Sequence, residues 1–211
     1  MPDIELIHER LAPINAAMPQ VLNTAHDRAM QGMNAMGLPR NRYRALYANN
    51  FIGVARNTIP EALEDDSWAI APERNTVQLT DRRTGLSVRL LKRFAIEGAV
   101  PPAGRNTARM QAWSQGTMLD VPVRAGGKKL EGIHLVLIWQ EENETLSCAA
   151  YMPKDAGRFP KSAKAEMIMK IPVTLPAGEF EGLRFSTKEP QTTLTPVRNT
   201  VIEHAHINTQ I

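Results

Sequence analysis

Positively charged side chains gather in three parts of this sequence, and they are its clearest candidates for binding a ligand. Arginine and lysine hold phosphate groups and carboxylates through their charge and their N–H donors. We therefore predict a basic surface that binds a nucleic acid or an acidic protein partner. The residues assigned to this surface are Arg40, Arg42, Arg44, Arg56, Arg82, Arg83, Lys154, Arg158, Lys161 and Lys164.

The first group lies on a helix that the pattern predicts over residues 40–56, beside the aromatic residues Tyr43, Tyr47 and Phe51. Arginines next to exposed rings suit phosphate contact combined with base stacking. An aromatic stripe at helical spacing is more often buried, which leaves the arginines on the solvated side of the same helix. Burial of the aromatic side chains is the commoner arrangement, so base stacking by exposed rings is the less frequent of the two.

The other two groups lie in predicted loops. Arg82 and Arg83 are at the tip of a hairpin, with Lys92 and Arg93 farther along the returning strand. A basic tip can enter a groove, although most such tips are simply solvated turns. The third group, in the loop 153–164, is the densest, and nearby acids offset its charge only in part. This loop is the strongest signal in the sequence for contact with phosphate or with an acidic surface.

Residues that could perform catalysis or hold a metal are sparse. His204 and His206 would point the same way on a strand, yet a closed metal site needs further ligands than these two. Cys148 has no cationic neighbour in the sequence that would activate its thiol. The acidic runs 64–66 and 141–142 fit helix caps and turns better than metal sites. With no phosphate-loop, dinucleotide-binding, nucleophile-elbow or zinc-protease motif, we expect a non-enzymatic protein without cofactor or metal.

Two other functions stay open. The amphipathic N-terminal helices and the polar tail, 199–211, could pack on a second copy of the chain and make the protein a homo-oligomeric assembly protein. A hydrolase could also be built from dispersed residues such as Asp120, His134 and Glu166, although nothing in their spacing demands it.

Composition narrows the class of protein. The chain has 211 residues, a formal charge of +3 and a pI of about 9.2, an excess that permits anionic partners without requiring them. A single cysteine excludes an intramolecular disulfide. The N-terminus lacks the basic and apolar regions of a signal peptide, and no apolar run approaches the roughly 20 residues that span a bilayer. We expect a cytoplasmic protein with no membrane contact.

The sequence predicts helices in the first part of the chain and mainly strands afterwards. Pro13 should kink or split the first helix, and Pro19 suits the start of a second one. Thr58 and Glu61 have the spacing of a capping box for a further short helix. We expect helices over 3–18, 19–36, 40–56, 59–65 and 107–115, the last capped by Asn106 or Thr107.

An apolar strand, 133–139, is the centre of the predicted sheet. Nearly every position in it is apolar, so both of its faces should be covered, and an acidic turn leads into an alternating return strand, 145–152. Further strands are expected over 76–80, 86–94, 120–123, 167–175, 180–187 and 192–197. The tripeptide Arg-Asn-Thr, at 56–58, 74–76, 105–107 and 198–200, is expected at element boundaries, where Asn and Thr satisfy backbone groups.

This order of helices and strands predicts an α+β fold, in which N-terminal helices pack on a mainly antiparallel, strongly twisted sheet or partial barrel. A helical segment over residues 1–66 and a β domain over 67–211 should form one unit.

Overall fold

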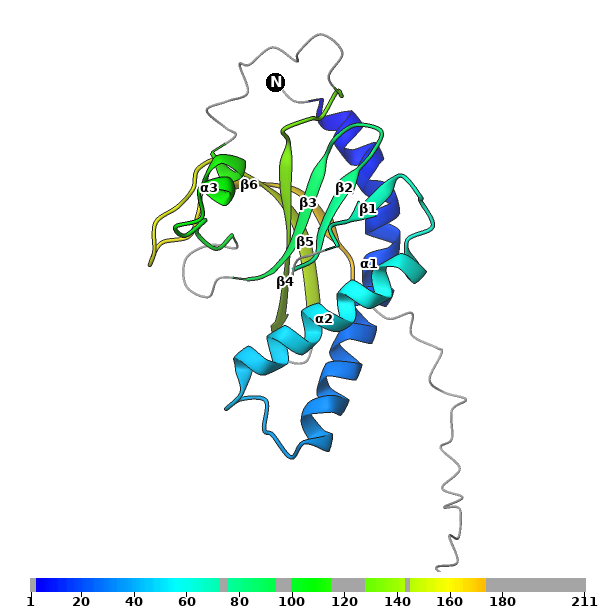
Figure 1. Cartoon of the computed structure of the whole chain (residues 1–211), viewed down its shortest axis with the longest axis vertical. Helices are drawn as coiled ribbons and strands as arrows, with labels where there is room; N and C mark the ends of the chain where they lie inside the picture. Colours follow the sequence, from blue (N-terminus) through cyan, green and yellow to red (C-terminus); the bar gives the residue numbers. More distant parts are fainter. Residues whose placement is uncertain (1–2, 73–75, 94–99, 115–127, 143–144, 174–211) are drawn as a thin grey trace, which may run out of the picture. The chain divides into compact units, whose positions relative to one another are not determined.

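The computed structural model describes residues 3–72, 76–93, 100–114, 128–142 and 145–173, all of which belong to the unit Met1–Leu175. The helices in this part of the chain are α1 (Ile4–Ala35), α2 (Arg44–Ala62) and α3 (Thr107–Trp113) (Figure 1). The strands are β1 (Trp68–Ile70), β2 (Gln78–Asp81), β3 (Ser87–Lys92), β4 (His134–Glu142), β5 (Thr145–Pro153) and β6 (Ala165–Ile171). The expected α+β class is confirmed.

The six strands form one mixed sheet in the order β1-β2-β3-β4-β5-β6. Four of its five ladders are antiparallel, but β3 runs parallel to β4, with Ser87 opposite His134 and Lys92 opposite Trp139. A long connection that includes α3 joins these two strands, as a parallel pair requires. The described strands leave the sheet open at β1 and β6, so the expected partial barrel is not confirmed.

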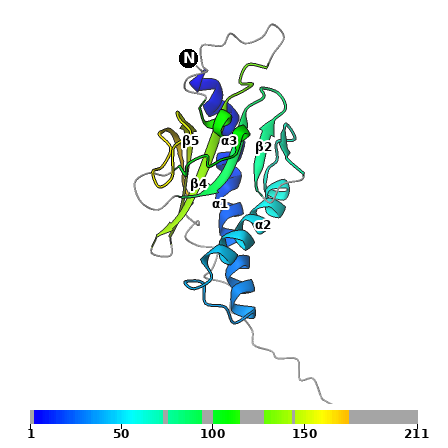
Figure 2. The same ribbon diagram turned by 60° about the vertical axis from the view of Figure 1, so that its left-hand side comes forward.

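Strand β4 lies in the interior, as its apolar run predicts. Leu135, Leu137 and Trp139 face the core that the sheet shares with α1 and α2, whereas Val136 and Ile138 face a second cluster that includes α3. All five side chains are 4% exposed or less. Both faces of the strand are therefore covered, and Figure 2 shows α3 and α1 on either side of it.

A single helix, α1, replaces the two helices expected from Pro13 and Pro19, so that prediction was wrong. A proline inside a helix removes a backbone hydrogen bond and costs about 3 kcal/mol. The apolar stripe nevertheless continues across both prolines, from Ile7 to Met33, and its side chains are buried against α2 and the sheet. Because each large apolar side chain contributes about 1.5–3 kcal/mol on burial, the stripe offsets both interruptions.

Helix α2 runs through the boundary expected at 56–58 and crosses the C-terminal half of α1 (Figure 1). The Thr58 hydroxyl donates to the Val54 carbonyl, 3.0 Å away and one turn earlier, instead of capping a new helix. The capping-box prediction was therefore wrong, and this copy of Arg-Asn-Thr lies inside a helix. The copy at 105–107 behaves as expected, because the Asn106 side chain accepts from the Arg109 N–H and caps α3.

The remaining strand predictions have mixed outcomes. The hairpins β2–β3 and β4–β5 form near their predicted bounds, while β1 was not predicted. In β6 the register shifts because Ile168 is an extra residue, and this bulge breaks the expected alternation and leaves Met167 48% exposed. The strands expected at 120–123, 180–187 and 192–197 and the tail lie outside the described residues. Within the described part, none of the helices has the length and apolar character needed to cross a membrane.

Candidate anion-binding sites

A pocket of about 450 Å³ lies where α2 begins, beside the end of β3. Three of its five lining residues are cations, and they come from segments that are far apart in the sequence. We call it the α2 pocket, and it is lined by Arg40, Asn41, Arg44, Tyr47 and Lys92. Two arginines of the first predicted basic group thus meet a lysine from the end of the β2–β3 hairpin.

A polar network fixes Arg40 on the inner side of the α2 pocket. Two of its N–H groups donate to the two carboxylate oxygens of Glu141, whose side chain is only 7% exposed. The Arg40 guanidinium carbon also lies 4.2 Å from the centre of the Tyr47 ring. The Tyr47 hydroxyl donates to Glu141 across 3.3 Å, and because a phenol has one proton, the Nδ1–H of His26, 2.8 Å away, donates to the phenol oxygen.

Positive charge exceeds negative charge around this pocket. Arg40 is paired with Glu141, and Arg44 and Lys92 add two further cations. Partial desolvation, followed by the charge of Arg40 and more weakly that of Arg44, lowers the pKa of Lys92, although Glu141 opposes the effect. Neighbouring cations disfavour the charged form of a lysine, and an incoming anion favours it. The electrostatics of the α2 pocket therefore suit an anionic ligand.

The start of α2 adds backbone donors to the same place. Its N-cap residue, Tyr43, makes no side-chain hydrogen bond to the helix, and the first turn has no acidic residue. The N–H groups and the dipole at such a terminus favour an anion. Tyr43 is 36% exposed and lies beside Arg42, whose guanidinium carbon is 5.9 Å from the ring centre. Tyr47 and Phe51 are buried in the core, so burial holds for two of the three aromatic residues.

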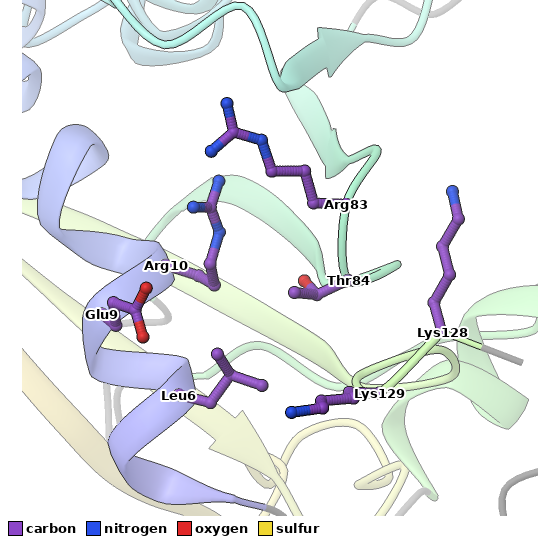
Figure 3. A pocket seen from close by; sticks show the side chains of 7 residues that line it. All are labelled: Leu6, Glu9, Arg10, Arg83, Thr84, Lys128 and Lys129. Atoms are coloured by element: carbon purple, nitrogen blue, oxygen red, sulfur yellow. The ribbon is translucent and has the colours of Figure 1, made fainter.

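A second pocket, of about 530 Å³, lies beside the β2–β3 turn (Figure 3). Residues from the start of α1, from this turn and from the segment before β4 surround it. We call it the hairpin pocket, and it is lined by Leu6, Glu9, Arg10, Arg83, Thr84, Lys128 and Lys129. Strands rise about 3.3 Å per residue, so β3 separates the two pockets by about 20 Å. The two ends of one basic hairpin therefore belong to different sites.

A buried ion-pair network forms one wall of the hairpin pocket. Arg10 Nε donates to Asp81 Oδ2 across 2.9 Å, and Arg10 Nη2 donates to Asp65 Oδ2 across 3.0 Å. Asp81 is completely buried and also accepts from Thr84 and from the Arg83 N–H. Burial alone raises the pKa of Asp81, but these hydrogen bonds outweigh it and lower that pKa to about 2. Arg10 is therefore paired with both carboxylates, and its single positive charge leaves the network with a net charge of −1, which Arg83 approaches to 3.8 Å.

Arg56 lies apart from both pockets and has a local structural role. Its guanidinium donates to the backbone carbonyls of Ala71, Pro72 and Thr76, and so ties α2 to the connection between β1 and β2. Neither pocket is lined by Arg56, whereas Arg40 and Arg44 both line the α2 pocket.

The loop 153–164 carries its cations on an ordered turn. Asp155 accepts the N–H group of Lys164 across 2.9 Å, which closes the loop. Lys154 Nζ lies 2.7 Å from Glu166 Oε2, so its charge is shared with a carboxylate. The exposed cations of this loop are Lys154, Arg158, Lys161 and Lys164, and Arg82 is likewise exposed at the β2–β3 turn.

No protein-family model, curated protein or solved structure matches the chain.

Of the residues considered for a hydrolase, His134 lies on β4 and Glu166 on β6, with β5 between them. Neighbouring strands are about 4.8 Å apart, so the two backbones are separated by about 10 Å across the sheet. Asp120, like His204 and His206, lies outside the described residues. Among those that are described, no three His, Cys, Asp or Glu side chains are placed to hold a metal ion.

Sequence reasoning missed Glu141 and Arg10, the two residues around which the pockets are built. Glu141 belongs to an acidic run that is typical of a turn, but β4 continues past it and places its side chain beside α2. Arg10 falls between Ile7 and Ile14 on the buried stripe of α1. A charge inside an apolar stripe is a signal that could have identified Arg10, because buried charges are almost always paired.

Proposed function

We propose that this chain is a non-enzymatic binding protein that holds a single-stranded nucleic acid at the α2 pocket. The observation that carries the proposal is the convergence of Arg40, Arg44 and Lys92 on one pocket, where Arg40 is paired with Glu141. Phosphate groups neutralise such an excess of positive charge, and their counterions are released on binding.

A single strand fits this surface better than a duplex. Tyr43, the N-cap residue of α2, is 36% exposed and has Arg42 beside it, so it can stack on an unpaired base. Bases in a duplex are already stacked on one another, whereas unpaired bases are free to stack on an aromatic side chain. The phosphates would lie against Arg44 and Lys92 and against the N–H groups at the start of α2.

The polar network behind the pocket supports binding rather than catalysis. Both oxygens of Glu141 accept hydrogen bonds from Arg40, and one also accepts from Tyr47, so this carboxylate is not a free base. Burial, followed by the charge of Glu141, raises the pKa of the Tyr47 phenol, which therefore keeps its proton. The network positions Arg40 and leaves its outer edge for a ligand.

Fluorescence anisotropy with a labelled single-stranded oligonucleotide tests the proposal across a series of salt concentrations. Each phosphate contact in a single strand contributes about −0.7 to the slope of log affinity against log salt, so the two cations Arg44 and Lys92 predict a slope of about −1.4. The double variant Arg44→Ala/Lys92→Ala should bring the slope close to zero. Arg40 is left in place, because its removal would leave the buried Glu141 without its partner.

The matched control is Arg158→Ala/Lys161→Ala, which removes the same charge from the exposed loop. It should leave the slope close to that of the wild type. An equal loss in both double variants would mean diffuse attraction and would contradict a site at the α2 pocket. No binding at low salt would exclude a nucleic-acid ligand, and binding of polyglutamate alone would assign the pocket to an acidic protein partner.

Self-assembly is the weaker alternative. It was expected because the N-terminal helices are amphipathic, but the apolar stripe of α1 is buried in the core of the same chain. Light scattering at micromolar concentration tests it directly, and a monomer would remove this alternative.

A further inference from the structure

The hairpin pocket has the dimensions of a small-molecule site and a different chemistry from the α2 pocket. Its volume of about 530 Å³ is within the range of ligand pockets in proteins, roughly 300–1,000 Å³. In Figure 3, Arg10, Glu9 and Leu6 extend from α1 on one side, and Lys128 and Lys129 stand on the other. Cations, a carboxylate and an apolar side chain thus surround one space.

The cations around this pocket differ in how far they are already neutralised. Arg10 is engaged by Asp81 and Asp65 and forms a fixed wall. Arg83 has a side chain that is 66% exposed, and its nearest approach to Asp65 is a long 3.8 Å, so it can turn toward a ligand. Lys128 and Lys129 are exposed on the opposite rim.

Carboxylates limit the charge that the hairpin pocket can accept. Glu9 lines it, and Glu131 accepts the backbone N–H of Lys128 behind the rim. Arg83, Lys128 and Lys129 therefore stand against Glu9 and Glu131, and the buried network of Arg10, Asp65 and Asp81 behind them adds a net charge of −1. The three exposed cations can contact one phosphate group, but the pocket has no excess of positive charge for a run of phosphates. A carboxylate in the lining also offers an acceptor for a ligand hydroxyl.

We infer that the hairpin pocket binds a small organic phosphate that carries hydroxyl groups. The phosphate is held by Arg83, Lys128 and Lys129, and a hydroxyl donates to Glu9. Leu6 contacts the carbon chain of the ligand. This site is separate from the proposed nucleic-acid site, which lies about 20 Å away at the other end of β3.

Calorimetric titration of the full chain with glycerol 3-phosphate and with methyl phosphate tests the inference. Both probes carry the phosphate, but only the first has hydroxyl groups for Glu9. We expect millimolar or tighter binding, with glycerol 3-phosphate preferred by about fivefold, the effect of one hydrogen bond of ordinary strength. The variant Arg83→Ala/Lys129→Ala should weaken both probes by tenfold or more, about what is expected for two charge-assisted contacts.

Two further variants separate the contact with the ligand hydroxyl from the contacts with the phosphate, and the hairpin pocket from the α2 pocket. Glu9→Ala should remove the preference for glycerol 3-phosphate without weakening methyl phosphate. Arg44→Ala/Lys92→Ala, in the α2 pocket, should leave both probes unchanged, so failure of the nucleic-acid proposal and failure of this one are distinguishable. The inference is overturned if neither probe binds at millimolar concentration, if Arg83→Ala/Lys129→Ala binds as tightly as the wild type, or if the preference survives Glu9→Ala.

Discussion

The network between Arg10 and Asp81 gives the sharpest prediction for stability. Asp81 is completely buried and accepts five hydrogen bonds, two from Arg10, two from Thr84 and one from the Arg83 N–H. Replacing it with asparagine keeps the shape but removes the charge, so Arg10 is left with Asp65 as its carboxylate partner. Breaking one half of a buried pair costs about 3–5 kcal/mol.

The lowered pKa of Asp81 gives a second value for the contribution of its negative charge to the free energy of unfolding. Folding lowers this pKa from 3.8 to about 2, which corresponds to about 2–3 kcal/mol at neutral pH. Because the folded value is the lower one, this stability is present above pH 3.8 and is lost as the pH falls through about 2. Taking about 3 kcal/mol and a urea slope of about 2 kcal/mol per molar, Asp81→Asn should lower the urea midpoint by about 1.5 M.

Urea unfolding followed by tryptophan fluorescence at neutral pH measures this shift, and Asp66→Asn, at an exposed position in the same loop as Asp65, is the control. The control should change stability by less than about 0.5 kcal/mol. The double variant Arg10→Met/Asp81→Asn should lose less than the sum of the two single variants, because it removes both charges together. A midpoint shift no larger than that of Asp66→Asn, or additive losses in the double variant, would refute a stabilising role for this pair. The difference between the wild type and Asp81→Asn should also shrink between about pH 5 and pH 2.

Two further predictions concern single residues. Burial raises the pKa of the Cys148 thiol from 9.0 to about 12, so a thiol reagent at pH 8 should modify the native protein about a thousandfold more slowly than the urea-unfolded chain, and equal rates would contradict burial. Gly157 has a φ of +59°, and an added Cβ would lie 2.7 Å from the Ala163 nitrogen, so Gly157→Ala should cost about 1–3 kcal/mol in thermal or urea unfolding. Gly53→Ala is its counterpart, because the site inside α2 is open and alanine should stabilise the helix there by about 0.5–1 kcal/mol.

The strands were easier to predict from the sequence than the helix ends. An apolar run such as β4 has few stable places other than the middle of a sheet, and it is buried on both faces. Pro13 and Pro19 are strong local signals for the end of a helix. Each costs a few kcal/mol inside a helix, but burial of the long apolar stripe of α1 contributes more than this. Thr58 failed as a cap for the same reason, since α2 continues to bury apolar side chains beyond it.

The candidate sites were predictable in residue type but not in grouping. Arg40, Arg44 and Arg83 were recognised as cations that could meet an anion, and all three line pockets. Grouping them by closeness in the sequence failed, because a strand of six residues carries Lys92 away from Arg83, whereas folding brings Lys92 to Arg44. Folding also separates residues that the sequence grouped: Arg56 was assigned to the first basic group, yet it lies outside the α2 pocket and donates to three backbone carbonyls.

Helix α1 links the two pockets physically, and this decides where functional variants can be placed. Arg10 forms a wall of the hairpin pocket, and His26, on the same helix, donates to Tyr47 behind the α2 pocket. At a rise of 1.5 Å per residue the two lie about 24 Å apart on one rigid element. A change in the stripe between them would disturb both sites through the core. Only rim residues such as Lys92 and Lys129 can be replaced to test one pocket while the other is left intact.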